Sequence, residues 1–123
     1  MKSIKLESMT DEQLVERFVA IGLEQDQAVL YDDIPDFNRL FDLKQAVVEE
    51  LRRRPGDRRR LLLELYDHEN WQVRLNAVKN SLALAPEEGR RLLQAMADSM
   101  KQPYAGNAGM TLWTLDEGIF KPE

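Results

Sequence analysis

A chain of 123 residues has the length of one compact domain, and 43% hydrophobic residues are enough to build a core. The lack of cysteine and the single histidine, His68, exclude thiolate nucleophiles, disulfides and zinc sites with cysteine ligands. The formal net charge of −5 lies wholly in residues 1–45, where ten acidic residues face five basic ones.

No apolar run approaches the roughly 20 residues that a membrane-spanning helix needs. The first residues, Met1–Glu7, lack the apolar segment of a secretory signal. No serine stands in a Gly-x-Ser-x-Gly motif that would use His68 in a catalytic triad. We therefore expect a cytoplasmic protein with no membrane partner, no catalytic residue, no metal site and no cofactor.

The first third of the chain predicts two helices. Residues 10–13 have the pattern of a capping box before a helix near 11–21, and Gly22 is expected to end that helix. A second, short helix is predicted at 24–32. Pro35 is expected to stop this second helix, because the residue before a proline is biased away from helical backbone angles.

The clearest amphipathic pattern covers residues 37–54, where apolar side chains recur on one helical face. Lys44 lies on the same face, and we expect its ammonium group to extend outward to water. A turn follows at 55–57, and Asp57 is expected to cap the N-terminus of a helix at 58–66. The apolar face of the helix predicted at 37–54 comprises Phe37, Leu40, Phe41, Val47, Val48 and Leu51.

The helix predicted at 71–84, after a turn at 67–70 and an Asn70 cap, is apolar on two sides. A helix of this kind packs between neighbours, because both faces need to be covered. One apolar face comprises Trp71, Leu75, Val78, Leu82 and Ala85, the other comprises Val73, Ala77 and Leu84, and the polar arc comprises Gln72, Asn76 and Lys79.

A further helix is predicted at 86–100, with Pro86 in its first turn and Pro103 beyond its end. Its apolar stripe comprises Leu92, Leu93, Met96 and Met100. Residues 105–109 are expected to form a glycine-rich turn. A last short helix is predicted at 108–117 with Gly118 at its C-cap, although the alternation of Leu112, Trp113 and Leu115 also fits a strand. The fold class is all-α.

Four residues of the turn and helix at 67–77 resemble the signature of a HEAT repeat: Asp67, Val73, Arg74 and Ala77. The resemblance implies a short right-handed α-α superhelix of the HEAT/ARM type with about six to seven helices. It implies one domain over residues 1–123, with 104–123 as a C-terminal capping segment. Asp67 and Arg74 are then structural residues that hold the turn in place.

The whole chain is also similar to an uncharacterised bacterial family of small HEAT-like proteins of unknown function. This similarity rests on residues 70–74 (Asn-Trp-Gln-Val-Arg) and on residues 108–116 of the C-terminal region. It implies a fold and carries no known activity.

Six arginines between residues 52 and 60 form the largest basic group of the sequence. Such a group can hold a phosphate backbone, and HEAT-like DNA-alkylation repair proteins use basic concave surfaces. However, Glu49 and Glu50 stand four residues before Arg53 and Arg54, which is the favourable order for ion pairing on a helix. The sequence pI of about 5.0 also favours an ion-paired turn. The cluster comprises Arg52, Arg53, Arg54, Arg58, Arg59 and Arg60.

Four other features have a structural and a functional interpretation. The acidic group Asp32, Asp33 and Asp36 can attract a cation or a basic partner, but it lacks the pattern of a calcium loop, and Asp36 suits a helix N-cap. Residues 106–109 can offer backbone N–H groups to an anion, but a turn is the simpler interpretation. Trp71 is expected in the core, Trp113 more in the open, and His68 in an exposed turn.

Two functions remain for this sequence. The first is a non-catalytic protein-interaction module, of adaptor or immunity type, that binds another protein through a concave face or through the acidic first third of the chain. The second is a nucleic-acid-binding or DNA-repair-related HEAT-like domain that uses the arginines and an aromatic residue. The candidate interaction surface is the six arginines with Trp113.

Overall fold

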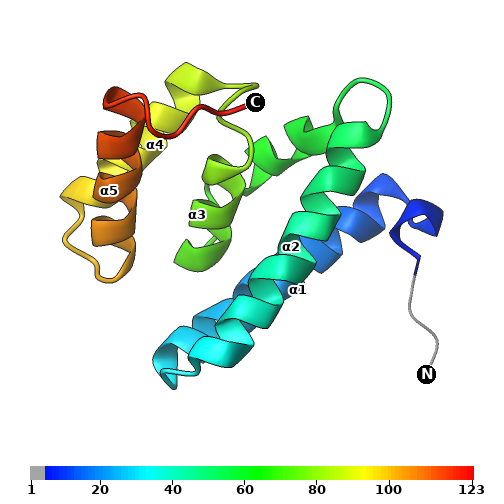
Figure 1. The fold of residues 1–123 in the computed structure, drawn as a ribbon, viewed down its shortest axis with the longest axis horizontal. Helices are drawn as coiled ribbons and strands as arrows, with labels where there is room; N and C mark the ends of the chain where they lie inside the picture. The colour runs from blue at the N-terminus through cyan, green and yellow to red at the C-terminus, as the bar shows by residue number, and fades with distance from the viewer. Residues whose placement is uncertain (1–4) are drawn as a thin grey trace. The chain divides into compact units, whose positions relative to one another are not determined.

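The computed structural model describes residues 5–123, and this part of the chain is helical with no strand. The all-α class and the expected number of helices are confirmed. The expectation for the segment Met1–Glu7 falls mostly outside the described residues. The elements are η1 (Leu6–Ser8), α1 (Asp11–Leu30), α2 (Ile34–Arg53), η2 (Arg58–Leu65), α3 (Trp71–Lys79), α4 (Pro86–Asp98) and α5 (Tyr104–Asp116), where η marks a 3₁₀ helix (Figure 1).

The chain divides between Leu61 and Leu62 into two compact units, which we describe separately as the N-terminal unit and the C-terminal unit. A single domain over residues 1–123 with a capping segment at 104–123 stays a prediction. Among the described residues, no helix combines the length and the apolar character that crossing a membrane requires.

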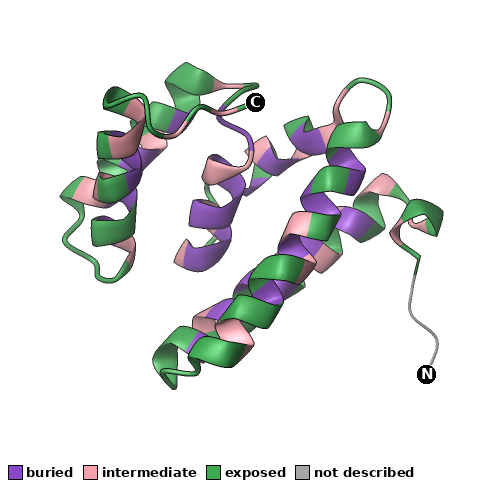
Figure 2. Ribbon diagram, viewed as in Figure 1, coloured by how far each residue is buried: buried purple, intermediate pink, exposed green. Residues whose placement is uncertain are grey.

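The N-terminal unit is an antiparallel pair of long helices, α1 and α2 (Figure 1). Buried residues follow one side of each helix, so the pair shares a continuous core (Figure 2). Buried residues recur along α1 at alternating intervals of four and three residues. This pattern is typical of two helices that pack at a small angle. These residues are Leu14, Phe18, Ile21, Gln25 and Ala28 on α1, with Leu40, Val47, Val48 and Leu51 on α2.

Helix α1 begins with the predicted capping box: Thr10 Oγ1 accepts from the Gln13 N–H and Gln13 Oε1 accepts from the Thr10 N–H. The predicted break at Gly22 is wrong, because the helix continues to Leu30. Gly22 is buried on the side of α1 that holds Phe18 and Ile21. Packing along the whole stripe outweighs the cost of about 1 kcal/mol of a glycine inside a helix.

Pro35 begins a helix and does not end one. It stands in the first turn of α2, where the missing N–H of proline costs nothing. The predicted cap at Asp36 is also wrong, since Asp33 Oδ1 accepts from the Asp36 N–H at 3.1 Å. The apolar residue Ile34 therefore starts α2 three positions earlier than the amphipathic pattern indicated.

Two other expectations for the N-terminal unit need correction. Lys44 does not extend to water: its side chain is buried and its Nζ lies 4.5 Å from the centre of the Phe41 ring. The helix after the 55–57 turn is the 3₁₀ helix η2 and not an α-helix. Asp57 still stands at its start and accepts from the Arg59 N–H at 3.3 Å.

The C-terminal unit contains α3, α4 and α5 around one apolar cluster. Asn70 caps α3 as predicted, with its Oδ1 accepting from the Val73 N–H at 3.0 Å. The helix ends at Lys79, five residues earlier than expected, because the side chains of Asn80 and Ser81 donate to backbone carbonyls one turn back. The cluster comprises Leu75, Val78, Leu82, Leu93, Met96, Ala108 and Leu112.

The polar arc expected on α3 is only partly exposed. Gln72 and Asn76 are buried, and Gln72 Nε2 donates to Asn76 Oδ1 at 3.0 Å. Trp71, expected in the core, is half-buried and packs against the apolar cluster. Burial on nearly all sides agrees with a helix that packs between neighbours.

Residues 105–109 lie inside α5, so the predicted turn is wrong and residues 108–117 are helical rather than extended. The Gln102 side chain accepts from the Gly106 N–H at 2.9 Å and stabilises this first turn. Gly118 follows the helix in the left-handed conformation, with φ of 71°, as its predicted capping role requires. Met100 lies beyond the end of α4 and is exposed, so it does not belong to the apolar stripe.

Two glycines of the C-terminal unit make a matched test of this packing. A Cβ at Gly89 of α4 would lie 2.5 Å from Leu82 Cδ2, whereas a Cβ at Gly109 of α5 would lie 4.0 Å from the nearest atom, Ala97 Cβ. We expect Gly89→Ala to lower the free energy of unfolding by about 1 kcal/mol, because overpacking outweighs the gain in helix propensity.

We expect Gly109→Ala to raise the free energy of unfolding by about 0.5–1 kcal/mol, since alanine fits and favours the helix. Urea unfolding followed by circular dichroism measures both effects. A loss of stability in Gly109→Ala would contradict a helix that begins at Tyr104.

Candidate functional site

The arginine cluster lies where α2 ends and η2 begins, at one end of the N-terminal unit (Figure 1). Arg54 makes the most contacts. Its Nη1 donates to Asp11 Oδ1 at 2.9 Å, and its Nε donates to Glu50 Oε2 at 2.9 Å. Its Nη2 donates to the backbone carbonyls of Leu6 and Met9 at 3.1 and 2.6 Å. Arg54 therefore joins η1, the start of α1 and the end of α2.

Three further arginines of the cluster are also ion-paired. Arg58 Nε donates to the second oxygen of Asp11 at 2.9 Å, and Arg53 pairs with Glu50. Arg59 is buried and donates to both oxygens of Asp57 at 2.8 and 2.6 Å. Arg52 and Arg60 are exposed.

These pairs change the acidity of the carboxyl groups. The hydrogen bond from Arg54 lowers the pKa of Asp11, with a smaller contribution from Arg58. Hydrogen bonds from Arg53 and Arg54 lower the pKa of Glu50, and Arg59 lowers that of Asp57. Three carboxylates thus balance half of the six positive charges of the cluster.

The four residues that resemble the HEAT signature lie in and after the turn that precedes α3. Val73 and Ala77 are fully buried, and Asp67 is exposed. Arg74 Nε donates to the backbone carbonyl of His68, and its guanidinium carbon lies 5.3 Å from the centre of the Trp71 ring. Arg74 thus contacts a carbonyl of the turn that precedes α3.

The half-buried Trp71 has a second cation beside it, because Lys101 Nζ lies 4.7 Å from its ring centre. Trp113 is 53% exposed on α5, so it is the more open tryptophan, as expected. Trp113 belongs to the C-terminal unit and the arginines to the N-terminal unit.

The most apolar exposed surface lies at the other end of the N-terminal unit, where α1 turns into α2. We call residues 28–37 the hairpin tip. Leu30, Tyr31 and Ile34 are 71%, 75% and 63% exposed, and exposed residues cover this end of the helix pair (Figure 2). A shallow pocket of about 210 Å³ opens beside Ile34, lined by Ala28, Val29, Asp32, Asp33, Ile34 and Phe37.

The sequence does not predict the apolar part of this surface. Leu30 and Tyr31 lie near the end of the short helix predicted at 24–32, and Ile34 lies outside every predicted helix. The available signal was that the buried stripe of α1 ends at Ala28, whereas the chain remains apolar for three more residues. Large apolar side chains beyond the end of a core stripe have no core to enter.

The acidic residues of the hairpin tip have local roles. Asp33 caps α2, and Asp36 Oδ1 accepts from Arg39 Nε at 2.9 Å. Asp32 is in the left-handed conformation, with φ of 54°, and forms part of the tight turn. Within residues 5–123, no group of three or more His, Asp or Glu side chains is placed to hold a metal ion.

A family of domains of unknown function, DUF2019, matches residues 12–116. The chain belongs to the DUF2019 family. This DUF2019 chain is similar to the protein RPA1889 from Rhodopseudomonas palustris, whose crystal structure shares 45% sequence identity and a TM-score of 0.94. The match covers 98% of this chain and 100% of RPA1889. No curated protein matches the sequence.

The similarity to a bacterial family of unknown function that the sequence indicated is therefore confirmed in this general form. Neither the family nor the structural relative adds a substrate, a ligand or a partner to this DUF2019 chain.

The ion pairs of Arg54 predict a dependence of stability on pH. Because the folded pKa values of Asp11 and Glu50 lie below their ordinary values of 3.8 and 4.5, these groups stabilise the fold above pH 4–5. That contribution is lost as the pH falls through the folded pKa values. We expect Arg54→Met to be less stable at neutral pH and to lose less stability than the natural protein between about pH 5 and pH 2.

Urea unfolding at a series of pH values measures this difference. Arg39→Met is the matched control, because it removes an exposed ion pair with Asp36 on the surface of α2. Parallel pH profiles for the natural protein and Arg54→Met would show that Arg54 does not hold these carboxylates.

Proposed function

We propose that this protein is a non-catalytic protein-interaction module of adaptor type, and that its hairpin tip binds a basic segment of a partner with apolar side chains. The observation that carries the proposal is the combination of exposed apolar side chains with a local excess of negative charge. The partner then binds to the acidic first third of the chain, which contains the hairpin tip.

The apolar part of the hairpin tip supplies the contact area. Leu30, Tyr31 and Ile34 are exposed, and Ile34 also lines a pocket that a single partner side chain can enter. Large exposed apolar side chains that gather at one place are typical of interaction sites, and tyrosine is enriched among residues that carry binding energy. Burial of a few such side chains is worth several kcal/mol before the costs of association.

The charge around the hairpin tip selects the kind of partner. Residues 24–42 hold six acidic residues and one basic residue, Arg39, so their charge of −5 equals that of the whole chain. Arg39 is itself paired with Asp36. A surface of this sign attracts a basic partner and accelerates its approach, and it repels nucleic acid.

We also propose that residues 67–77 are a HEAT-like repeat and that the fold belongs to the right-handed superhelical class. The hydrogen bond from Arg74 to the His68 carbonyl and the full burial of Val73 and Ala77 support the repeat. In such proteins the repeats form a scaffold, and binding takes place on surfaces that the repeat signature does not describe.

We also propose that the protein is not an enzyme and that it is cytoplasmic. The single histidine has a structural contact, because His68 Nδ1 accepts from the Asn70 N–H at 2.9 Å. This contact fixes the imidazole in the turn before α3 and occupies the nitrogen that a general base would use.

Nucleic-acid binding through the arginine cluster is the alternative. Arg53, Arg54, Arg58 and Arg59 are paired with carboxylates, and phosphates would have to displace Asp11, Glu50 and Asp57 from them. The pairing therefore favours the protein partner over the nucleic acid.

The test uses a designed helical peptide with lysine on one face and leucine on the other, labelled with a fluorophore. Its counterpart replaces every lysine with glutamate. We expect the basic peptide to bind and to shift the amide NMR signals of residues 28–37. Tyr31→Ser/Ile34→Ser keeps every charge, and we expect it to weaken binding at least about tenfold, because two apolar contacts are lost.

Ile119→Ser is the control, because it removes a similarly exposed apolar side chain from the C-terminal unit. Equal affinity of the natural protein and the hairpin-tip variant would contradict the proposal. Binding of a short DNA duplex at low salt, abolished by Arg58→Ala/Arg59→Ala, would support the alternative instead.

A further inference from the structure

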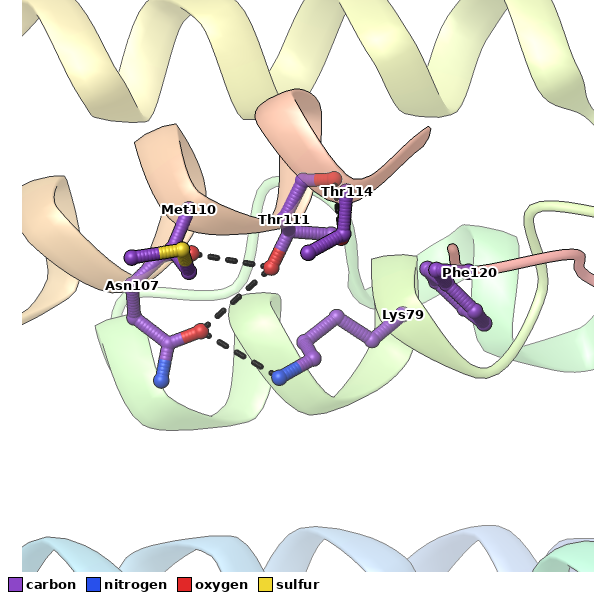
Figure 3. A pocket seen from close by; sticks show the side chains of 6 residues that line it. All are labelled: Lys79, Asn107, Met110, Thr111, Thr114 and Phe120. Carbon is purple, nitrogen blue, oxygen red and sulfur yellow. Dashed lines mark hydrogen bonds between the residues drawn. The ribbon is translucent and has the colours of Figure 1, made fainter. Parts of the chain in front are cut away.

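One pocket of the C-terminal unit lies between α3, α5 and the segment after α5. We call it the Lys79 pocket. Its volume of about 430 Å³ falls in the range of small-molecule sites, which is roughly 300–1,000 Å³. It is lined by Lys79, Asn107, Met110, Thr111, Thr114 and Phe120 (Figure 3).

The polar groups of the Lys79 pocket form one connected arrangement. Lys79 Nζ points to Asn107 and donates to its Oδ1 at 3.2 Å (Figure 3). Thr111 Oγ1 donates to the Asn107 carbonyl at 2.8 Å, and Thr114 Oγ1 donates to the Thr111 carbonyl at 2.8 Å. Both hydroxyl hydrogens are therefore used within α5.

The hydrogen-bond donors that remain for a ligand are the N–H groups of Lys79 and Asn107, while the two threonine oxygens can still accept. An ammonium group has three N–H bonds and an amide NH₂ has two. Asn107 Oδ1 faces Lys79, so the amide NH₂ stands on the other branch of the same side chain, beside the ammonium group (Figure 3). No Asp or Glu belongs to the described residues that line the pocket, so its formal charge is positive.

Burial acts on the same lysine. Desolvation lowers the pKa of Lys79, and no carboxylate among the described residues offsets this effect. An anion beside the ammonium group would stabilise its charged form and raise the pKa again. The positive charge of Lys79 thus favours a negatively charged ligand in this pocket.

Apolar side chains bound the rest of the pocket. Met110 is 60% exposed at its edge, and Phe120 lies on the other side of Lys79 (Figure 3). A methionine at such a position adapts to the shape of what it contacts. These side chains can cover an apolar body but offer no hydrogen bond to a polar one.

We propose that the Lys79 pocket binds a small carboxylate with an apolar body. The carboxylate accepts hydrogen bonds from Lys79 and from the Asn107 amide, and the apolar body lies against Met110 and Phe120. This site is independent of the hairpin tip, because it belongs to the other unit of the chain.

The test is a titration of the full chain with phenylacetate, followed by amide NMR signals and by the side-chain signals of lysine. Phenylacetamide is the probe of the same shape without the charge. We expect phenylacetate to shift the amide signals of residues 79, 107 and 110–114, and phenylacetamide to bind at least about tenfold more weakly, because a charged hydrogen bond is lost.

We expect Lys79→Gln to weaken phenylacetate binding by a similar factor of about ten or more. Lys101→Gln is the matched control, since it removes a lysine of the same unit that lies on Trp71, and we expect unchanged affinity. In the natural protein, we expect saturation with phenylacetate to raise the pKa of Lys79, a readout that needs no variant. Equal binding of the two probes, or an unchanged Lys79 pKa at saturation, would overturn the proposal.

Discussion

The contacts of one guanidinium group, that of Arg54, determine how the N-terminal unit is held together and which of its surfaces is available. Arg54 joins two carboxylates and two backbone carbonyls from η1, α1 and α2. Because it and three neighbouring arginines are paired, we infer that the basic cluster is mainly structural. The opposite end of the 20-residue helices, about 30 Å away, carries a local charge of −5 in residues 24–42 and exposed apolar side chains.

Local signals in the sequence were sufficient for much of the fold. The capping box at Thr10 and the Asn70 cap place the starts of α1 and α3 correctly, because a side chain within three residues decides each. Two of the errors share a cause: Gly22 predicts a helix end and residues 105–109 predict a turn, but both lie inside helices. A glycine inside a helix costs little compared with the packing of that helix against a neighbour, and the neighbour is not visible in a local pattern.

The candidate sites also contain some contacts that the sequence predicts and others that it does not. Ion pairing in the arginine cluster was predictable, since Glu50 and Arg54 are four residues apart on one helix. The role of Asp11 was not predictable, because it stands 43 residues from Arg54 in the chain. The Lys79 pocket brings together α3 and α5 in the same way, and only the folded C-terminal unit places Lys79 beside Asn107, 28 positions later.

The central claim is that Arg54 and Arg59 hold carboxylates and do not bind phosphates, so that interaction takes place elsewhere. It can be measured directly from the Nε–Hε NMR signals of the arginine side chains, with and without a short DNA duplex at low salt. We expect the signals of Arg54 and Arg59 to exchange slowly with water and to keep their positions when the duplex is added. Shifted or broadened signals of both residues on addition of the duplex would contradict the claim.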